Sequence, residues 1–294
     1  MKVLVLGGEG MLGHKMFQTL LERFPDTACT VRGSLSDPFY RRIGLFRAGR
    51  VIERVDAADV PSLARTLRDA APGVIVNCVG IVKQRDEAAA AIPCITLNAL
   101  LPHTLAELSR EWGGRVIHFS TDCVFSGRRG GYVEGDPSDA DDLYGRTKSL
   151  GEVTAENALT LRTSIIGREL DHFRSLLEWF LAQRGKTVRG FTRVIWSGVT
   201  TNRLARIVGD LVADHAGLAG LYQVASRPVS KHELLRMIRD AFRVDVTIVP
   251  DDREASDRSL SGEKFLGATG WRAPDWPDLA EELARDPTPY ETWR

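Results

Sequence analysis

The chain opens with MKVLVLGGEGMLG (residues 1–13), and this stretch predicts how the fold begins. Val3 to Gly7 is a run of branched apolar residues ending in glycine, as expected for a strand buried on both faces of a parallel sheet. Residues 11–24 then show the apolar spacing of a helix. A buried strand, a glycine turn and a helix therefore come first in the chain.

The glycines of this turn, Gly7, Gly10 and Gly13, are spaced G-x-x-G-x-x-G. In a strand–turn–helix unit, such glycines make the tight turn, let a pyrophosphate approach the backbone and let the helix pack on the strand. The helix N-terminus adds partial positive charge. The pattern predicts a dinucleotide-binding turn that includes Met11 and Leu12, with a turn that binds no ligand as the alternative.

The pattern of strand followed by helix continues through the first half of the chain. Further strands are predicted at 27–32, 73–80 and 115–121, and helices at 60–70, at 98–112 and from Tyr144 to about Asn157. A strand-like stretch also covers 50–55. Because such alternation implies parallel strands joined by right-handed crossovers, we expect an α/β fold with a doubly wound parallel (Rossmann) sheet.

After residues 159–167, which continue the apolar strand pattern, the rhythm loosens. We expect residues 1–167 to form the NADP-binding domain, with 200–226 returning to it, and residues 168–199 and 227–294 to form a smaller C-terminal substrate domain. The sequence predicts helices at 173–183, 203–214, 230–242 and 276–285, a strand at 220–225, a Gly/Thr-rich connection at 185–202 and a loop-rich segment from Pro250.

The composition excludes several classes of protein. Lys+Arg and Asp+Glu number 39 each, so no overall field favours nucleic acid or an anionic membrane. No apolar run reaches membrane-spanning length, and the first residues read as a strand instead of a signal peptide. The four cysteines have no CxxC spacing and the histidines no metal-ligand spacing, so we expect a cytoplasmic protein without disulfides or bound metal.

The end of the second predicted strand, TVRGS, bears on the choice of cofactor. Arg32 lies there with no acid before Asp37, and an arginine at this place suits the 2′-phosphate of NADPH, whereas NAD sites have an acid. We expect NADPH, with NADH as the alternative; Arg32 as an ordinary surface arginine is the other interpretation. Further predicted cofactor contacts are Asp56, Cys78, Val79 and Gly80.

The fourth strand ends in STDCVFSG (120–127), and YGRTK (144–148) follows after a loop. Tyr144 and Lys148 are four residues apart, so they share one face of a helix. A free phenol has a pKa near 10, and we expect the Lys148 ammonium and the positively charged nicotinamide of the oxidised cofactor to lower the pKa of Tyr144. Lys148 is also expected to hold the nicotinamide ribose. Thr121 is expected to orient the substrate carbonyl toward Tyr144, which donates the proton.

These motifs together carry a family resemblance. GGEGMLG, NCVG, STDCVFSG and YGRTKSLGE, in this order, resemble the extended short-chain dehydrogenase/reductases. Within them the chain is most similar to the dTDP-4-dehydrorhamnose reductase group and related nucleotide-sugar 4-ketoreductases. The resemblance implies a Rossmann domain with a smaller substrate domain, catalytic roles for Thr121, Tyr144 and Lys148, and a place for Asp122 at the substrate edge. The family precedent also suggests a homodimer.

Two departures from the family pattern bear on the sugar. Cys123 stands where the rhamnose-forming reductases usually have an aromatic residue, and NCVGIVKQ brings Lys83 toward the site. Both favour relatives that act on UDP-linked 4-keto-6-deoxy sugars. Candidate substrate contacts are Lys83, Asp122, Cys123, Arg193, Trp196 and Arg258; surface exposure of Lys83 and simple packing of Trp196 are the alternatives.

The predicted function is NADPH-dependent reduction of the 4-keto group of a dTDP- or UDP-linked 4-keto-6-deoxy sugar. A 4,6-dehydratase would have an acid pair after the threonine, whereas here Asp122 is followed by Cys123. Two alternatives stay open. One is an epimerase that holds NAD tightly, and the other is a non-catalytic NADP-binding regulatory subunit, although such subunits tend to lose the Tyr or the Lys.

Overall fold

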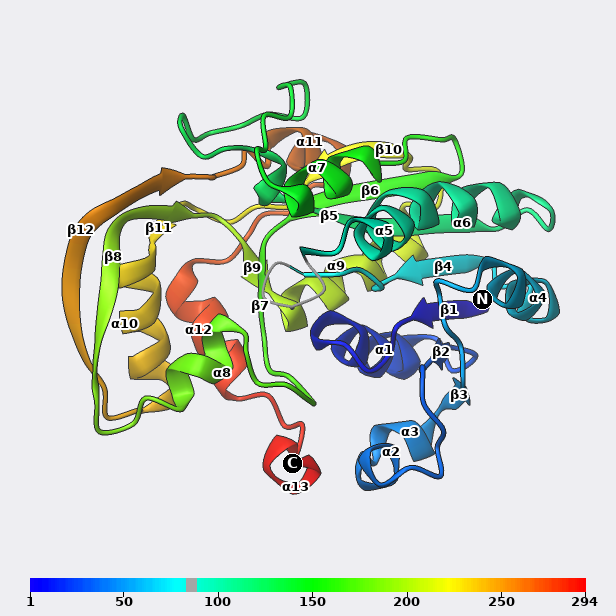
Figure 1. The fold of residues 1–294 in the computed structure, drawn as a ribbon, viewed down its shortest axis with the longest axis horizontal. Coiled ribbons are helices and arrows are strands. Elements are labelled where there is room, and N and C mark those ends of the chain that lie inside the picture. The colour runs from blue at the N-terminus through cyan, green and yellow to red at the C-terminus, as the bar shows by residue number, and fades with distance from the viewer. Residues whose placement is uncertain (83–88) are drawn as a thin grey trace.

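The computed structural model describes residues 1–82 and 89–294, and Figure 1 shows its arrangement. Lys83, a predicted substrate contact, therefore lies outside the described residues. Seven parallel strands form the central sheet: β1 (Val3–Leu6), β2 (Ala28–Thr30), β3 (Arg50–Ile52), β4 (Val74–Asn77), β5 (Arg115–Thr121), β6 (Ala158–Thr163) and β10 (Gly220–Gln223).

The strand order is β10-β6-β5-β4-β1-β2-β3, which confirms the predicted doubly wound sheet. Val5 of β1 pairs with Cys29 of β2 on one side and with Val76 of β4 on the other. The chain first builds outward from β1 through β2 to β3, then crosses back to place β4 beside β1. Because connections leave in opposite directions there, a crevice opens at the carboxyl ends of β1 and β4, where such sheets bind ligands.

Helices cover both faces of this sheet (Figure 1). α1 (Met11–Arg23) and α9 (Thr201–Asp214) pack together on one face. α4 (Val60–Ala70) and α6 (Leu101–Arg110) cover the other. Successive residues of β1 alternate between the two resulting cores, as the period of two in a strand requires. Burial on both faces explains why the central strands are continuous apolar runs in the sequence.

A second layer of sheet and helices lies beside the central sheet, at the left of Figure 1. Its three strands are ordered β11-β8-β12, and its helices enclose a core of their own. Its elements are α8 (Leu176–Leu181), β8 (Thr187–Trp196), β11 (Val229–Ser230), α10 (Lys231–Phe242), β12 (Thr247–Asp257) and α12 (Trp276–Ala284).

Short elements complete the described fold. A two-stranded pair, β7 with β9, lies where the chain passes between the two layers. The short elements are α2 (Pro38–Arg42), α3 (Leu45–Ala48), α5 (Ala91–Cys94), the π-helix η2 (Ile95–Leu100), the 3-10 helix η3 (Asp122–Val124), α7 (Leu143–Leu150), β7 (Ile165–Ile166), β9 (Val199–Thr200), α11 (Glu263–Thr269) and α13 (Tyr290–Trp293).

Two segments predicted as loops are in fact long strands. β8 occupies most of the predicted connection 185–202, and β12 continues past Pro250 to Asp257. The two pair in parallel along most of their length, with an irregularity between Asp251 and Ala255. Much of β12 is polar and exposed, so neither the apolar run nor the strict alternation that indicates a strand was present. Its partner lies some sixty residues earlier in the chain, which local patterns do not reveal.

The helix predicted from Tyr144 to about Asn157 ends earlier, at Leu150. At Gly151 the chain passes so close to η2 that a Cβ would lie 1.9 Å from the Asn98 carbonyl oxygen. The prediction for 98–112 also needs correction, since the segment begins as the π-helix η2 and becomes α-helical at Leu101. Close packing of one helix end against another decides both boundaries.

The C-terminal segment returns to the first layer. Tyr290 and Trp293 of α13 and Phe265 of α11 pack in the core that contains α1. The sequence placed all of 227–294 in the smaller domain. We therefore propose two domains as predicted, except that α11 and α13 belong to the nucleotide-binding domain.

Buried polar contacts tie this C-terminal segment to the glycine turn. His14 Nδ1 lies 2.8 Å from the Gly10 carbonyl oxygen, so it donates, and its Nε2 accepts from the Tyr290 hydroxyl at 2.9 Å. Burial lowers the pKa of His14 to about 4, which keeps the ring neutral for both contacts. Lys15 Nζ forms an ion pair with Asp286 Oδ2 at 2.7 Å, and both side chains are almost fully buried.

Replacing Asp286 with alanine is expected to destabilise the protein by about 3–5 kcal/mol, because it leaves the Lys15 ammonium buried without a counter-charge. Urea denaturation measures the change. Asp210→Ala is the matched control: Asp210 pairs with Arg23 at 2.5 Å on the surface, and an exposed pair contributes about 0–1 kcal/mol. Equal losses in the two variants would show that burial of the Lys15 pair does not matter.

No helix in the described part of the chain is long and apolar enough to cross a membrane. Nor do the described residues include a group of three or more His, Cys, Asp or Glu side chains that could hold a metal ion.

Candidate active site

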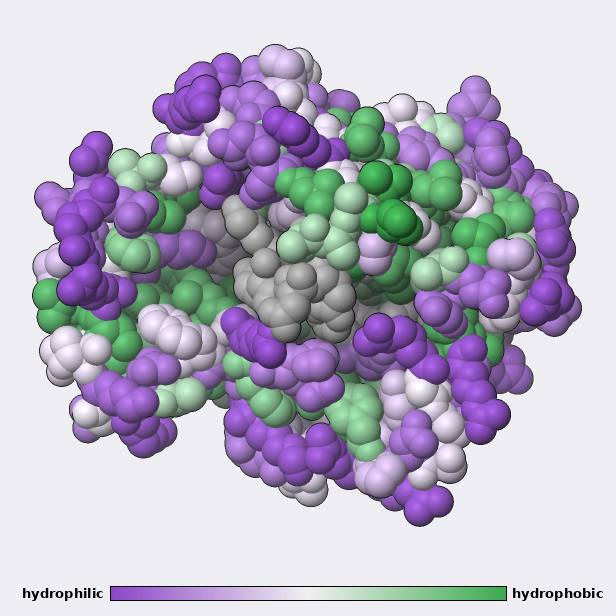
Figure 2. All heavy atoms as spheres, viewed as in Figure 1, coloured by the Kyte–Doolittle hydropathy of each residue, from purple (hydrophilic) through white to green (hydrophobic). Residues whose placement is uncertain are grey.

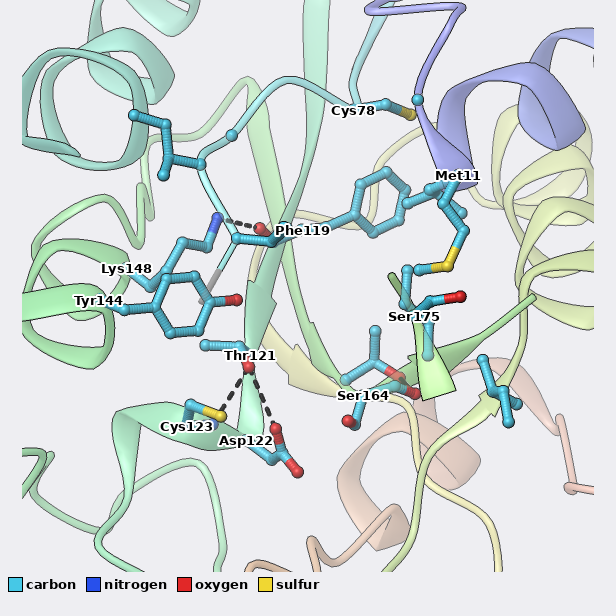
Figure 3. A pocket seen from close by; sticks show the side chains of 18 of the residues that line it. Met11, Cys78, Phe119, Thr121, Asp122, Cys123, Tyr144, Lys148, Ser164 and Ser175 are labelled. Carbon is cyan, nitrogen blue, oxygen red and sulfur yellow. Dashed lines mark hydrogen bonds between the residues drawn. The ribbon is translucent and has the colours of Figure 1, made fainter. Parts of the chain in front are cut away.

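Two adjoining cavities open at the carboxyl ends of the central strands. The first, of about 460 Å³, is lined by Thr121, Tyr144 and Lys148, and we call it the Tyr144 cavity (Figure 3). The second, of about 370 Å³, is lined by Arg32 and is called the Arg32 cavity. Both are lined by Gly10, Met11, Cys78, Val79, Gly80 and Ile81. One elongated ligand that crosses the end of β1 would therefore reach both.

The glycine turn has the geometry that its sequence predicts. Gly7 has a φ of +79°, and a Cβ on Gly13 would lie 1.9 Å from the Gly7 carbonyl oxygen. Only glycine at position 13 allows α1 to pack this closely on the turn. α1 begins without a side-chain cap at Gly10, and Gly10 and Met11 line both cavities, so the start of the helix lies where the cavities meet. These features fit a pyrophosphate.

Most of the predicted cofactor residues line these cavities. Gly7, Arg32 and Asp56 line the Arg32 cavity, and Leu12 lines the Tyr144 cavity. Gly13 lines neither and acts through packing. Arg32 is already engaged, because its Nε donates to Glu9 Oε1 at 2.9 Å. The sequence had not singled out Glu9.

β5 delivers Thr121 and Asp122 to the Tyr144 cavity. The backbone turns into η3 after Thr121, whose hydroxyl accepts from the Cys123 N–H at 3.1 Å and donates to Asp122 Oδ1 at 3.1 Å. These contacts fix the Thr121 hydroxyl at the cavity wall (Figure 3). Burial raises the pKa of Asp122, and the charge of Lys231 acts in the opposite direction.

α7 places Tyr144 and Lys148 beside Thr121. Asp142 caps the helix by accepting from the Gly145 N–H at 2.7 Å. A Cβ at position 145 would lie 2.3 Å from the Cys123 carbonyl oxygen, so glycine there lets the helix approach η3. In Figure 3 the Tyr144 ring and the Lys148 chain lie side by side, with the phenol directed toward Thr121. The three predicted catalytic residues therefore meet in one cavity.

The residues of the chain do not by themselves lower the pKa of Tyr144, as had been expected of Lys148. Burial raises the pKa of the Tyr144 phenol, and a hydrogen bond with Thr121 offsets only part of this. The Lys148 ammonium is turned to the Phe119 carbonyl, with Nζ donating at 2.6 Å. Desolvation of the phenolate is the largest cause of the rise. A raised pKa keeps the proton on Tyr144, which suits a proton donor.

A buried histidine lies beneath Lys148, although the sequence assigned no chemistry to the histidines. Asn77 Oδ1 accepts from the Val79 N–H at 3.1 Å, which turns Asn77 Nδ2 to His118 Nδ1 at 3.1 Å. From these contacts we infer that the His118 proton is on Nε2, which lies 3.4 Å from Lys148 Nζ. Burial, followed by the charge of Lys148, lowers the pKa of His118 well below its usual value.

The second layer contributes Trp196 and Lys231 to the Tyr144 cavity. Trp196 packs on Trp276 with ring centroids 4.9 Å apart. Lys231 Nζ lies 4.4 Å from the centre of the Trp196 ring. Burial lowers the pKa of Lys231 to about 8, while Asp122 acts in the opposite direction. Lys231 was missed as a site residue; its only local signal is the capping-box sequence SKHE at the start of α10.

The other predicted substrate contacts divide. Asp122, Cys123 and Trp196 line the Tyr144 cavity. Arg193 is exposed on β8, and Arg258 donates from Nε to the Phe125 carbonyl at 2.9 Å. Neither arginine belongs to the described lining of the two cavities. The charge of Arg258 nevertheless acts on the buried Asp122, whose pKa it lowers. The roles of both arginines stay predictions.

Comparisons with known proteins agree with this architecture. The probable dTDP-4,6-dihydroxy-2-methyloxan-3-one 4-ketoreductase of Streptomyces antibioticus is 29% identical over 97% of this chain and 95% of its own. Methionine adenosyltransferase 2 subunit beta of Danio rerio is 25% identical over 83% of this chain and 74% of its own. The crystal structure of dTDP-4-dehydrorhamnose reductase from Bacillus anthracis in complex with NADP has a TM-score of 0.77 and 20% identity, covering 96% of this chain and 98% of that one, which shows a shared fold.

A model of a protein family also matches this chain. It matches residues 1–263, which include the glycine turn, Thr121, Tyr144, Lys148 and Lys231. The resemblance predicted from the motifs is thereby confirmed. This chain belongs to the family described as the RmlD substrate binding domain.

Proposed function

We propose that this protein is an NADPH-dependent reductase of the 4-keto group of a nucleotide-diphosphate-linked 4-keto-6-deoxy sugar. The observation that carries the proposal is the meeting of Thr121, Tyr144 and Lys148 in a cavity that continues to the glycine turn. The turn and the N-terminus of α1 would hold the pyrophosphate of the cofactor, and Lys148 the nicotinamide ribose.

The residues of the chain then have distinct tasks. Without substrate the Thr121 hydroxyl donates to Asp122 Oδ1; with substrate bound, the same proton would turn to the substrate carbonyl oxygen and orient it toward Tyr144. A nicotinamide held beside Lys148 would supply the hydride that the carbonyl carbon receives. The electron pair of the C=O bond moves to oxygen, and Tyr144 donates its proton there, so that a hydroxyl forms. Lys148, one turn along α7, stabilises the phenolate left on Tyr144.

The sugar partner is tested by supplying dTDP- and UDP-linked 4-keto-6-deoxy sugars with NADPH and identifying the product. The name of the Streptomyces antibioticus relative makes a dTDP-linked sugar the first to try. We expect NADPH consumption that depends on the sugar and a product reduced at C4. If no sugar of either series supports oxidation of NADPH, the proposed reaction is wrong.

Turnover is expected to fall as pH rises through about 8, because burial lowers the pKa of Lys148 to about 8. Below this pH the ammonium is present and stabilises the phenolate; above it the neutral amine cannot. Glu152 partly offsets the lowering, and the inferred Nε2–H of His118 does not favour the charged form. A pH–rate profile of kcat measures the fall.

The variant Lys148→Arg tests which group titrates, since Lys231 faces the same cavity with a similar pKa of about 8. Arginine keeps its charge throughout this range. In Lys148→Arg the fall should therefore move to higher pH. A fall that stays near pH 8 would assign it to Lys231 instead of Lys148.

A regulatory role is the second candidate, because one relative is named a subunit of methionine adenosyltransferase. The presence of both Tyr144 and Lys148 in one cavity favours catalysis. Dinucleotide binding without turnover on any 4-keto sugar would favour the regulatory role. NAD that remains bound through purification would favour the epimerase alternative.

We also propose a cytoplasmic homodimer. The described structure contains no disulfide between its four cysteines, which fits a reducing compartment. Exposed Ile92, Leu100 and Leu150 lie on α5, η2 and α7, which pack against one another, and hydrophobic residues gather over α5 in Figure 2. Such a patch suits a second copy of the chain. Sedimentation equilibrium tests this, and a monomer at assay concentrations would contradict it.

A further inference from the structure

The Arg32 cavity carries an excess of negative charge. Its described lining includes four carboxylates, on Glu9, Asp56, Glu169 and Asp171, against the single guanidinium of Arg32. NADPH differs from NADH by a 2′-phosphate on the adenosine ribose, and this group carries negative charge at neutral pH. A cavity built only for NADPH would be expected to show the opposite balance.

Glu9 is held in place by three hydrogen bonds. Its Oε2 accepts from the Arg32 backbone N–H at 3.1 Å and from the Tyr40 hydroxyl at 2.5 Å, and its Oε1 accepts from Arg32 Nε at 2.9 Å. The Tyr40 oxygen in turn accepts from the Gly33 N–H at 2.9 Å. The Glu9 side chain is only 16% exposed, whereas that of Arg32 is 65% exposed.

In this arrangement Glu9 and Arg32 would favour different cofactors. Glu9 uses three acceptor sites, so its carboxylate can still accept from a ribose 2′-hydroxyl. A 2′-phosphate at the same place would be repelled by Glu9, while the exposed end of the Arg32 guanidinium would attract it. Arg32 alone, as the sequence suggested, favours NADPH over NADH. Arg32 paired with Glu9 favours NADPH less strongly.

We propose that Glu9, from within the glycine turn, is a specificity-determining residue that limits the preference for NADPH and lets the protein use NADH as well. The inference rests on the proposed function only in placing the adenosine ribose in the Arg32 cavity. It adds that the choice between cofactors depends on a pair of opposite charges, one from the turn and one from the end of β2.

The test measures the dissociation constants of NADP⁺ and NAD⁺ by isothermal titration calorimetry, for the unaltered protein and for Glu9→Gln. Glutamine removes the charge and keeps the size of the side chain, but its single oxygen can replace only one of the two carboxylate oxygens that accept from Arg32 and Tyr40. We expect the unaltered protein to bind both nucleotides, and the ratio of the two constants to move toward NADP⁺ by roughly tenfold in Glu9→Gln. Because the charges are partly exposed, the shift should shrink at high salt.

Two further variants keep the outcome clear. Arg32→Gln should move the ratio in the opposite direction, toward NAD⁺. Glu53→Gln is the matched control, because Glu53 accepts from the Leu35 N–H at 2.7 Å near the same loop but does not line the described cavity; its ratio should not change. If Glu9→Gln weakens both nucleotides equally, Glu9 only supports the turn and the inference is wrong. If the unaltered protein binds neither nucleotide, the proposed function itself fails.

Discussion

Replacing Tyr144 with phenylalanine is expected to lower kcat by about 10²–10⁴-fold, the usual contribution of a positioned general acid. Phenylalanine keeps the ring that packs beside Lys148 and removes only the hydroxyl that faces Thr121 (Figure 3). Burial raises the pKa of Tyr144, so the phenol holds its proton over the whole range of the assay, whereas phenylalanine has no proton to donate at any pH. Steady-state kinetics with NADPH and a 4-keto nucleotide sugar measure the effect.

Cofactor binding should survive this change, because the glycine turn and Arg32 are untouched. Tyr222→Phe is the matched control: Tyr222 lies on β10, the edge strand of the sheet, and its ring packs against Phe265. It does not belong to the described lining of either cavity. Near-native kcat in Tyr144→Phe would overturn the assignment of the proton donor.

Gly13→Ala is expected to lower kcat/KM for NADPH by about 10²-fold, the order of loss that follows a displacement of about 1 Å at a reactive site. The new Cβ would lie 1.9 Å from the Gly7 carbonyl oxygen and 2.8 Å from the Gly7 carbonyl carbon. Both are backbone atoms, so α1 or the turn must move. The overpacking should also cost about 1–3 kcal/mol of stability, which thermal denaturation measures.

The control for this change is Gly267→Ala in α11. Apart from its chain neighbours and the backbone of its own helix, no atom of the described residues lies within 4 Å of a Cβ at this position. Because alanine is the better helix former, this variant should gain about 0.5–1 kcal/mol and keep its kinetics. A Gly13→Ala protein with unchanged affinity for NADPH would show that the turn does not contact the cofactor.

The elements that the sequence predicted well are those with strong local signals. β5 runs from Arg115 to Thr121 and α4 from Val60 to Ala70, as their patterns indicate. Their apolar residues face buried cores, so the spacing of apolar residues along the sequence indicates the type of element. β8 and β12 show no such apolar pattern, because many of their residues are polar and exposed. They form strands by pairing with each other.

The active site shows the same division between local and distant information. Thr121 and Tyr144 could be predicted because a strand end and a helix face are properties of adjacent residues. Lys231 could not, because it reaches the cavity from a helix that begins more than a hundred residues after Asp122. His118 looked like one more residue of a buried strand, and only the packing of α7 brings it to Lys148.

By itself the sequence determined the order of the chemistry: a nucleotide-binding turn, a hydroxyl at a strand end, then a phenol and an amine four residues apart. Such motifs act through neighbours along the chain, so composition and spacing are enough to recognise them. The tertiary structure decided how these groups behave. Burial keeps the proton on Tyr144, turns Lys148 into a group that titrates near pH 8, and sets Glu9 against Arg32. Desolvation and the pairing of charges depend on which distant segments pack together, and these decide protonation and cofactor choice.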